Sequence, residues 1–480
     1  MLPDVQSLIL NILLIYIVLY AILQLVNDQK HTENIMKIHL FEHFTYKKLF
    51  RFTLPSILMM IFTSVYCVVD GYFVSNFVGE TPFAAINFIM PFIMIMSSFG
   101  FMFGTGGSAL ISKTMGEGDR DKANRLFTML TCVSLITGII IAVLGIIFVR
   151  PLASALGAEG EMLDNCVVYG RIILGAMPTF MLQQEFQSFF VTAEKPQMGL
   201  ITTIGAGITN MLLDVLFIAG FGWGIVGAAA ATTVSQLVGG IIPIIYFSLP
   251  NSSLLKFTKP DFDFKALVKT CTNGSSELMS NAAMSLVGLL YNVQLMKHAG
   301  ESGVAAYGVM MYVGMIFIAI FIGYSIGTAP IVGYNYGAGN TDELKSLLKK
   351  SLTIMGVISC AMLILGEALA MPLSLLFMSK SPETLAITVH GFKIFSFQFL
   401  FCGIAIFGSG FFTALNNGLI SALISFLRTL VFQVAAIMLL PLIWEPAIDG
   451  IWGSIIVAEV SAAALTFVFL IANRKKYKYF

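Results

Sequence analysis

Charged side chains are scarce in this chain of 480 residues. Only 11% of the residues are charged, and 27 basic and 26 acidic side chains leave a net charge of +1. A chain so close to neutral has no overall field that would attract nucleic acid, so we expect no nucleic-acid partner. The 57% hydrophobic content and mean hydropathy of +0.88 instead require that many helices are buried in the hydrocarbon of a bilayer.

Reactive side chains are equally sparse. None of the six cysteines has the spacing of a metal site or a redox motif, so we expect all of them to be small apolar core residues. The five histidines fall at helix ends or in the amino-terminal segment, and none is expected to relay protons. A membrane acyl or glycosyl transferase would need clustered catalytic His, Asp or Glu, and the chain has no such cluster. We therefore predict that the protein is not an enzyme and needs no cofactor.

Two halves of the chain repeat one another. FVGETPFAA at 77–85 is answered by HAGESGVAA at 298–306, GFMFGT at 100–105 by GYSIGT at 323–328, and GEGD at 116–119 by GAGN at 337–340. The repeated unit is therefore roughly 220 residues long, a period that indicates duplication of a whole structural unit. In so apolar a chain, such a duplication predicts two membrane-embedded lobes that face each other, the arrangement of many transporters.

Apolar runs long enough to cross a bilayer predict an all-α membrane protein. We expect twelve transmembrane helices in two six-helix bundles, and one extra helix over Leu8–Val26 that is not cleaved as a signal peptide. The predicted divisions are an amino-terminal extension (1–40), an amino-terminal lobe (41–248), a cytoplasmic linker (249–270) and a carboxy-terminal lobe (271–480). Nothing in the sequence demands an oligomer, so we expect a monomer.

The connections between the predicted helices differ in charge on the two sides of the membrane. Basic residues concentrate in every second connection, which predicts that these connections are cytoplasmic. They include Lys113, Arg120, Lys122 and Arg125, then Lys195, then the linker, then Lys345, Lys349 and Lys350, and finally Arg474 to Lys478. The opposite connections carry mainly acidic residues, among them Glu159, Glu161, Asp164, Glu383 and Asp449.

A few polar residues lie deep within the predicted spans of the amino-terminal lobe. At 1.5 Å per residue, Asp70 lies roughly 13 Å below the outer end of the first helix, and Asp214 and Thr232 lie roughly 12 Å below the outer ends of the fifth and sixth. Asn210 lies one turn deeper than Asp214 on the same helix face. Because a charge at the bilayer centre is costly, this convergence predicts a cation or proton site.

Several of these stretches resemble a known family. PSILMMIFTSVYCVVDGYFVSNFVGETPFAA at 55–85, the GEGD motif and NMLLDVLFIAGFGWGIVGAAAAT at 210–232 are similar to the multidrug and toxic compound extrusion (MATE) family, on its bacterial DinF-like and MepA-like branch. The resemblance covers about residues 40–475. By motif, Asp70 matches the family's first-helix aspartate, Asn210 and Asp214 its N-x-x-x-D pair, and Thr232 its sixth-helix hydroxyl.

The resemblance implies a function. It implies a secondary active antiporter in the plasma membrane of a bacterium, which exports organic cations, drugs or metabolites by alternating access in exchange for protons or sodium ions. The sequence leaves the substrate and the coupling ion open. A related flippase of lipid-linked saccharide is the alternative, although it would want several cationic residues in the cavity. A membrane transferase is a second, less favoured alternative.

The carboxy-terminal lobe is not a chemical copy of the first. Glu459 stands where the first lobe has a threonine, and Arg428 on the preceding helix is expected to pair with it as a structural ion pair. Glu277, expected near the cytoplasmic face, is a possible ion or gate residue. Adaptable or aromatic side chains that could line a substrate cavity are Met59, Tyr66, Asn292, Tyr307 and Tyr312.

Overall fold

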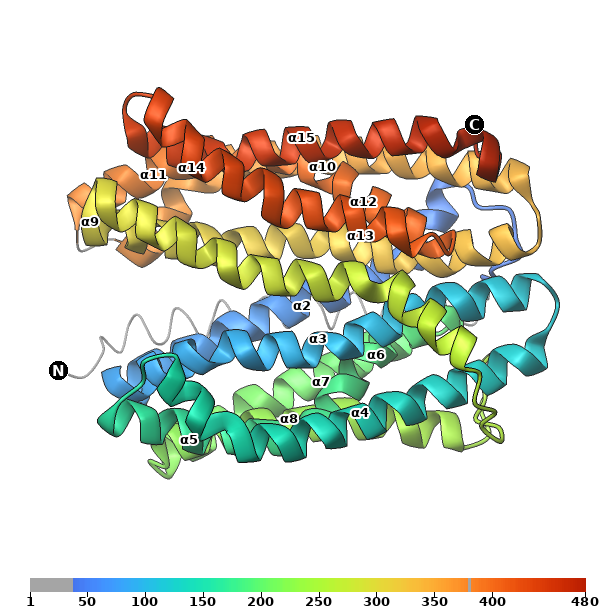
Figure 1. The fold of residues 1–480 in the computed structure, drawn as a ribbon, viewed down its shortest axis with the longest axis horizontal. Helices are drawn as coiled ribbons and strands as arrows, with labels where there is room; N and C mark the ends of the chain where they lie inside the picture. Colours follow the sequence, from blue (N-terminus) through green and yellow to red (C-terminus); the bar gives the residue numbers. More distant parts are fainter. Residues whose placement is uncertain (1–37, 379–380) are drawn as a thin grey trace.

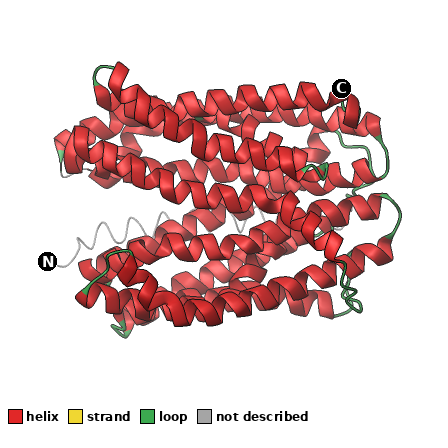
Figure 2. Ribbon diagram, viewed as in Figure 1, coloured by secondary structure: helices red, strands yellow, loops and turns green. Residues whose placement is uncertain are grey.

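The molecule is a pair of helical bundles. The computed structural model describes residues 38–378 and 381–480, and in these ranges the secondary structure is helical, with short connecting turns and no strand (Figure 2). The extra helix predicted over residues 8–26 lies outside the described residues. Figure 1 shows the two bundles side by side, one formed by the first half of the chain and the other by the second.

The amino-terminal lobe contains the helices from α2 to α8. A proline is accommodated inside α2, α3 and α4, and the chain bends between α5 and α6. The elements are α2 (Tyr46–Phe77), α3 (Glu80–Gly116), α4 (Arg120–Ala155), α5 (Gly160–Gly175), α6 (Met177–Thr192), α7 (Pro196–Asp214), the π-helical turn η1 (Val215–Gly220) and α8 (Gly224–Ser248).

The carboxy-terminal lobe begins with one continuous helical stretch. This stretch, α9 (Phe264–Gly337), is 74 residues long and turns at Gly300, whose φ of 60° and ψ of −154° are far from helical. After it come α10 (Thr341–Met378), α11 (Pro382–Ser396), α12 (Phe399–Ala414), α13 (Gly418–Phe426), η2 (Leu427–Phe432), α14 (Gln433–Ile443) and α15 (Ala447–Tyr477).

These helices account for the predicted twelve spans. Within the described ranges, nine helical segments are long and apolar enough to cross a bilayer, and two bent pairs, α5 with α6 and α11 with α12, bring the number to 11. A straight helix of 74 residues would be roughly 110 Å long, far more than one bilayer, so the turn at Gly300 divides α9 into two spans. The all-α fold with two repeated six-helix halves is thus confirmed.

The connection between the lobes is shorter than the predicted linker. The helix α9 begins at Phe264, six residues before the expected end of the linker at residue 270, and the Asp263 carboxylate caps it by accepting a hydrogen bond of 3.0 Å from the Ala266 amide. This local cap lies between an aspartate and the third residue after it, a common start signal for a helix. The helix therefore already includes residues that the sequence assigned to the linker.

The lobes touch at the end of the molecule that carries the basic connections, at the right of Figure 1. Gly116 and Gly337, the repeated glycines of GEGD and GAGN, face each other's helices there. A Cβ atom on Gly116 would lie 2.0 Å from the Tyr334 carbonyl oxygen, and one on Gly337 would lie 2.0 Å from the Lys113 carbonyl oxygen. Since no side chain fits in that space, the absence of a Cβ lets the backbones of α3 and α9 meet.

Deeper contacts continue this closure. The Asn416 side chain, in the turn after α12, donates a hydrogen bond of 3.0 Å to the Ala109 carbonyl of α3, and its amide oxygen accepts one of 2.7 Å from Asn273 of α9. The ribbons of the two lobes diverge toward the opposite end (Figure 1). The cytoplasmic side, as assigned from the basic residues, is therefore the closed side in this conformation.

The glycine contact leads to a first prediction. In Gly116→Ala the new methyl group must push α3 away from Tyr334, and overpacking of this kind costs about 1–3 kcal/mol, enough to reduce the closed population roughly tenfold. Cytoplasmic accessibility of an engineered cysteine near Tyr334 should increase and transport should fall. Gly205→Ala on α7 is the matched control, because no atom lies within 4 Å of its Cβ position. Wild-type closure in Gly116→Ala would contradict this account.

Candidate functional site

The candidate site lies where α2 packs against α7. A Cβ atom on Gly207 would lie only 2.4 Å from the ring of Phe62 and 3.1 Å from the ring of Tyr66, so the two helices approach closely at this glycine. Asp214 follows Gly207 by seven residues and Asp70 follows Tyr66 by four, so both acids lie on the contacting faces of their helices. The close approach therefore brings the two carboxylates together.

Asp70 faces both Asp214 and Asn210 in the structure. Asp214 and Asn210 are fully buried. Both oxygens of Asp214, both polar atoms of the Asn210 amide and one oxygen of Asp70 lack a hydrogen-bond partner of normal geometry among the protein atoms. Buried polar groups are almost always satisfied, so such a concentration of free lone pairs indicates a place for water, a proton or a cation.

The surroundings of the two acids supply no cation. In the part of the chain that the structure describes, the groups that act on Asp70 and Asp214 are each other, Asn210, and the phenol and thiol groups nearby, not a lysine or arginine. Two ionised carboxylates in such a place would repel one another strongly, because the low dielectric of the interior strengthens their interaction. The pair can therefore be accommodated when it shares a proton or binds a cation.

The fourth predicted site residue is placed differently. The Thr232 hydroxyl donates a hydrogen bond of 3.0 Å to the Ala228 carbonyl one turn earlier on α8, and thus serves its own helix in this conformation. Its oxygen still has a free lone pair, which is all that a cation ligand needs. The structure brings together Asp70, Asn210 and Asp214, while a role for Thr232 stays a prediction.

Sequence reasoning missed Tyr169. This buried tyrosine of α5 lies within electrostatic reach of both Asp70 and Asp214. A signal was present in the sequence, because Tyr169 is nine residues after the start of α5 at Gly160, roughly 13 Å below the outer end of the helix and so at the depth computed for the acids. Only the packing of the helices brings Tyr169 within reach of them.

The predicted cavity residues divide into three groups. Met59 and Tyr307 are buried inside their own lobes, and the Tyr307 ring stacks on Tyr291 at 4.9 Å. Asn292 lies exposed on α9. Tyr66 and Tyr312 lie near the candidate site: the hydroxyl of Tyr312, from the carboxy-terminal lobe, would be 3.9 Å from a Cβ atom on Gly71, beside Asp70. Tyr312 thus reaches from one lobe to α2 of the other, the helix that carries Asp70.

The carboxy-terminal lobe contains a buried ion pair. Arg428 of η2 donates from Nε to both carboxylate oxygens of Glu459 on α15, at 3.0 and 2.8 Å. The side chains are 14% and 2% exposed, so the pair is almost removed from solvent. Charge-assisted hydrogen bonds of this length compensate each charge directly.

Glu277 lies beside that pair. The helix α9 starts at Phe264, so Glu277 is roughly 20 Å along the helix from its first residue. There it is within electrostatic reach of Arg428. One guanidinium therefore lies close to two acids in this lobe, whereas the two acids of the other lobe have none.

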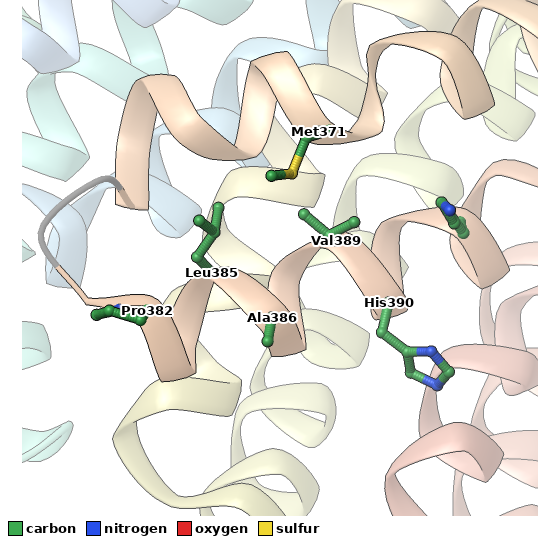
Figure 3. Close-up of a pocket in the computed structure, with 7 residues that line it drawn as sticks. Met371, Pro382, Leu385, Ala386, Val389 and His390 are labelled. Carbon is green, nitrogen blue, oxygen red and sulfur yellow. The ribbon is translucent and has the colours of Figure 1, made fainter.

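Two further features are separate from the candidate site. Glu185 of α6 is fully buried, and neither of its carboxylate oxygens has a hydrogen-bond partner of normal geometry. An apolar groove of ≈ 430 Å³ lies between α10 and α11 (Figure 3), where Met371 faces Leu385 and Val389. Its polar lining is His390, which is bound to Asp449 at 2.8 Å, and Lys393. Because the groove is in the other lobe, it takes no part in the acidic site.

The fold and site together define a class of protein. Twelve spans in two repeated lobes, with a buried acidic site in one lobe, are typical of a multi-pass membrane transporter built on an internal duplication. The MatE family model matches the chain twice, at residues 55–216 and 278–439, once in each lobe. The chain belongs to the MatE family.

Relatives and solved structures agree with this assignment. The multidrug export protein MepA of Staphylococcus haemolyticus is 26% identical over 438 residues, which cover 89% of this chain and 94% of the relative. The MepA of Staphylococcus aureus strain MSSA476 is 24% identical with the same coverage. A crystal structure of MATE in complex with MaL6 is similar in fold, with a TM-score of 0.86 at 22% identity over 91% of this chain and 98% of that one. A multidrug resistance MATE family transporter of the MOP superfamily, solved in an outward-facing conformation, matches with the same values.

The ion pair of the carboxy-terminal lobe yields a second prediction. Either Arg428→Met or Glu459→Leu alone should destabilise the protein by about 3–5 kcal/mol, because each leaves one buried charge without its partner. The double variant should regain most of the loss, since it buries no charge. Thermal unfolding of the purified protein in detergent measures all three. Equal losses in the single and double variants would show that the pair does not act as a unit.

Proposed function

We propose that this protein exports drugs and related organic cations across the membrane in exchange for protons or sodium ions. Its membership of the family and the multidrug export function in the names of its relatives support the substrate class. The proposal of an exchange with protons or sodium ions depends on one observation. This is the cluster of Asp70, Asn210 and Asp214, whose buried oxygens lack hydrogen-bond partners. Such a cluster gains stability whenever a cation or proton enters.

The donor set suits either coupling ion. Carboxylate, amide and hydroxyl oxygens are hard ligands that can replace the water shell of a sodium ion. Two facing carboxylates can equally share one proton, since like charges at close range disfavour full ionisation. The ion is cargo here and enters from the side where the lobes are apart.

Ion binding can reach the substrate path through Tyr312. With the site empty, repulsion between Asp70 and Asp214 opposes close packing of α2 against α7; a bound proton or cation removes that repulsion. Tyr312 of the carboxy-terminal lobe lies against Gly71, next to Asp70. A shift of α2 therefore changes a contact between the two lobes. The site of one lobe thereby influences the surface that the two lobes share, which alternating access requires.

The flippase alternative gains no support from Arg428. A lipid-linked pyrophosphate would need free cations in the central cavity, but the guanidinium of Arg428 is committed to Glu459 inside the carboxy-terminal lobe. Its side chain is 14% exposed, which leaves little of it to meet a ligand. The export of cations therefore remains the better supported function.

A third prediction tests the ion site. Asp70→Asn fixes a neutral side chain, so drug can still bind but gradient-driven export should be lost, whereas Asp70→Glu should keep part of it; Asp214→Asn should behave like Asp70→Asn. The measurement is ethidium efflux from vesicles, under an imposed proton gradient and then under a sodium gradient. The gradient that drives efflux in the wild type identifies the coupling ion.

Expression and membrane insertion of each variant are checked first. Asp164→Asn is the control, because it removes the same charge from an exposed aspartate near the start of α5, where Asp164 is paired with Arg150 at 3.1 Å. Efflux at the wild-type rate in Asp70→Asn would mean that another residue carries the coupling ion. In that event Glu277 and Glu185 are the next acids to replace.

A further inference from the structure

A short stretch immediately before α2 joins the cytoplasmic ends of the two lobes. We call this stretch, residues 38–45, the bridging segment. Its dipeptides His39–Leu40 and His43–Phe44 are bound in the same way. Leu40 and Phe44 are fully buried, while the imidazoles of His39 and His43 are 36% and 67% exposed. The segment leads directly into α2, which begins at Tyr46 and is capped by the Thr45 side chain.

Each histidine shares a carboxylate with the amide that follows it. Glu194, in the turn between α6 and α7, accepts hydrogen bonds from Leu40 N at 2.7 Å and lies 2.7 Å from His39 Nδ1. Glu343, in the first turn of α10, accepts from Phe44 N at 2.9 Å and lies 2.6 Å from His43 Nδ1. The first carboxylate belongs to the amino-terminal lobe and the second to the carboxy-terminal lobe.

Other polar groups complete the arrangement. Lys350 of α10 donates to the Phe44 carbonyl, and Asn335 near the end of α9 donates to the Leu40 carbonyl at 3.4 Å. Glu42 accepts from His39 N at 3.1 Å and from the Lys48 ammonium, whose hydrogen bond holds the pKa of Glu42 below its usual range. Glu42 therefore stays ionised across the physiological range, and Glu194 and Glu343 are the two groups that bind the imidazoles.

We infer that His39 and His43 form a cytoplasmic gate latch, which holds the inner ends of the lobes together and does so more strongly when the cytoplasm is acidic. The lobes cannot separate on this side while both histidines remain bound. If the segment stays with the amino-terminal lobe, the bonds to Glu343 break; if it stays with the carboxy-terminal lobe, those to Glu194 break. Opening of the cytoplasmic side therefore breaks one His–Glu pair in either case.

The sign of the pH effect follows from the charge on the imidazole. A neutral imidazole can donate from Nδ1, but a protonated one makes a charge-assisted hydrogen bond to the carboxylate, which is stronger. Histidine changes its charge near neutral pH, and both rings are exposed enough to exchange protons with the cytoplasm. The latch is therefore strongest at low pH and weakens as the pH rises.

The latch would act as a brake on the proposed exchange. The inference assumes the alternating-access cycle proposed above, in which the inner ends must separate once per cycle. If exchange carries protons inward, the fluid next to the latch becomes more acidic and the outward-facing conformation is held for longer. Export would then slow before the cytoplasm acidifies further. If sodium is the coupling ion, the latch still senses the pH of the cytoplasm.

The test measures the gate and not transport. Spin labels on the exposed Lys122 of α4 and Lys349 of α10, both substituted by cysteine in a chain without its native cysteines, report the distance between the inner ends by double electron–electron resonance. The full chain is reconstituted in nanodiscs, without drug or ion gradient, and compared at pH 8 and pH 6. The ratio of closed to open should rise about threefold at the lower pH, the effect of one partly exposed ion pair.

Two variants and a control decide the outcome. His39→Gln with His43→Gln keeps donors at both positions but no charge, so the pH response should disappear; Glu343→Gln should weaken it and increase the open population at both pH values. His390→Gln is the matched control, because that histidine also binds a carboxylate, Asp449 at 2.8 Å, but within one lobe. It should retain the full response.

The result that would overturn the latch is an unchanged pH response in the double histidine variant, with correct folding shown by size-exclusion chromatography. Loss of the response in His390→Gln would also count against it, since the effect would then be general. Because the distances are measured without a gradient, the latch can fail while export succeeds, and export can fail in vesicles while the latch responds. The two proposals are thus tested separately.

Discussion

A carboxylate buried in a membrane protein needs a counter-charge, a proton or a cation, and the two lobes meet this requirement differently. In the carboxy-terminal lobe Arg428 compensates Glu459 at 2.8 Å, and Glu277 lies beside the pair. In the amino-terminal lobe Asp70 and Asp214 face each other, and the partner of their free oxygens must come from outside the protein. An arginine thus lies against the buried acids of one lobe, whereas among the described residues no lysine or arginine does so for Asp70 and Asp214.

The internal duplication gives the two lobes the same helical framework, although their buried charges differ. The repeated glycines Gly116 and Gly337 let α3 and α9 meet backbone to backbone, so the closed cytoplasmic side is built from equivalent positions of the two halves. The chemistry built on that scaffold is not symmetric, since Thr233 of one lobe answers Glu459 of the other. A transporter needs this combination, because pseudo-symmetric lobes have two equivalent ways of packing, and a site in one lobe alone can favour one of them.

The contacts at the lobe interface lie both near the acidic cluster of Asp70 and Asp214 and at the cytoplasmic side. Tyr312 lies against Gly71, next to Asp70, while Asn416 and the bridging segment hold the inner ends. Each of these contacts joins residues of different lobes and must be remade when the lobes move. The hydrogen bonds among them can be replaced by hydrogen bonds to water when the lobes separate, so their loss costs little.

Much of the fold and part of the candidate site could be predicted from the sequence alone. Helical rise is constant, so counting residues from the helix ends was enough to place Asp70 and Asp214 at nearly the same depth, with Asn210 one turn deeper, and the alternation of basic connections predicted the orientation. The closeness of Glu277 to Arg428 was not predicted, because it depends on how α9 packs against η2. To predict that Tyr169 lies near the acids, one would need the rotation of α5 about its axis, and the packing of the helices determines that rotation. The pairs of His39 with Glu194 and His43 with Glu343 join residues 155 and 300 positions apart, so only the tertiary structure could bring them together.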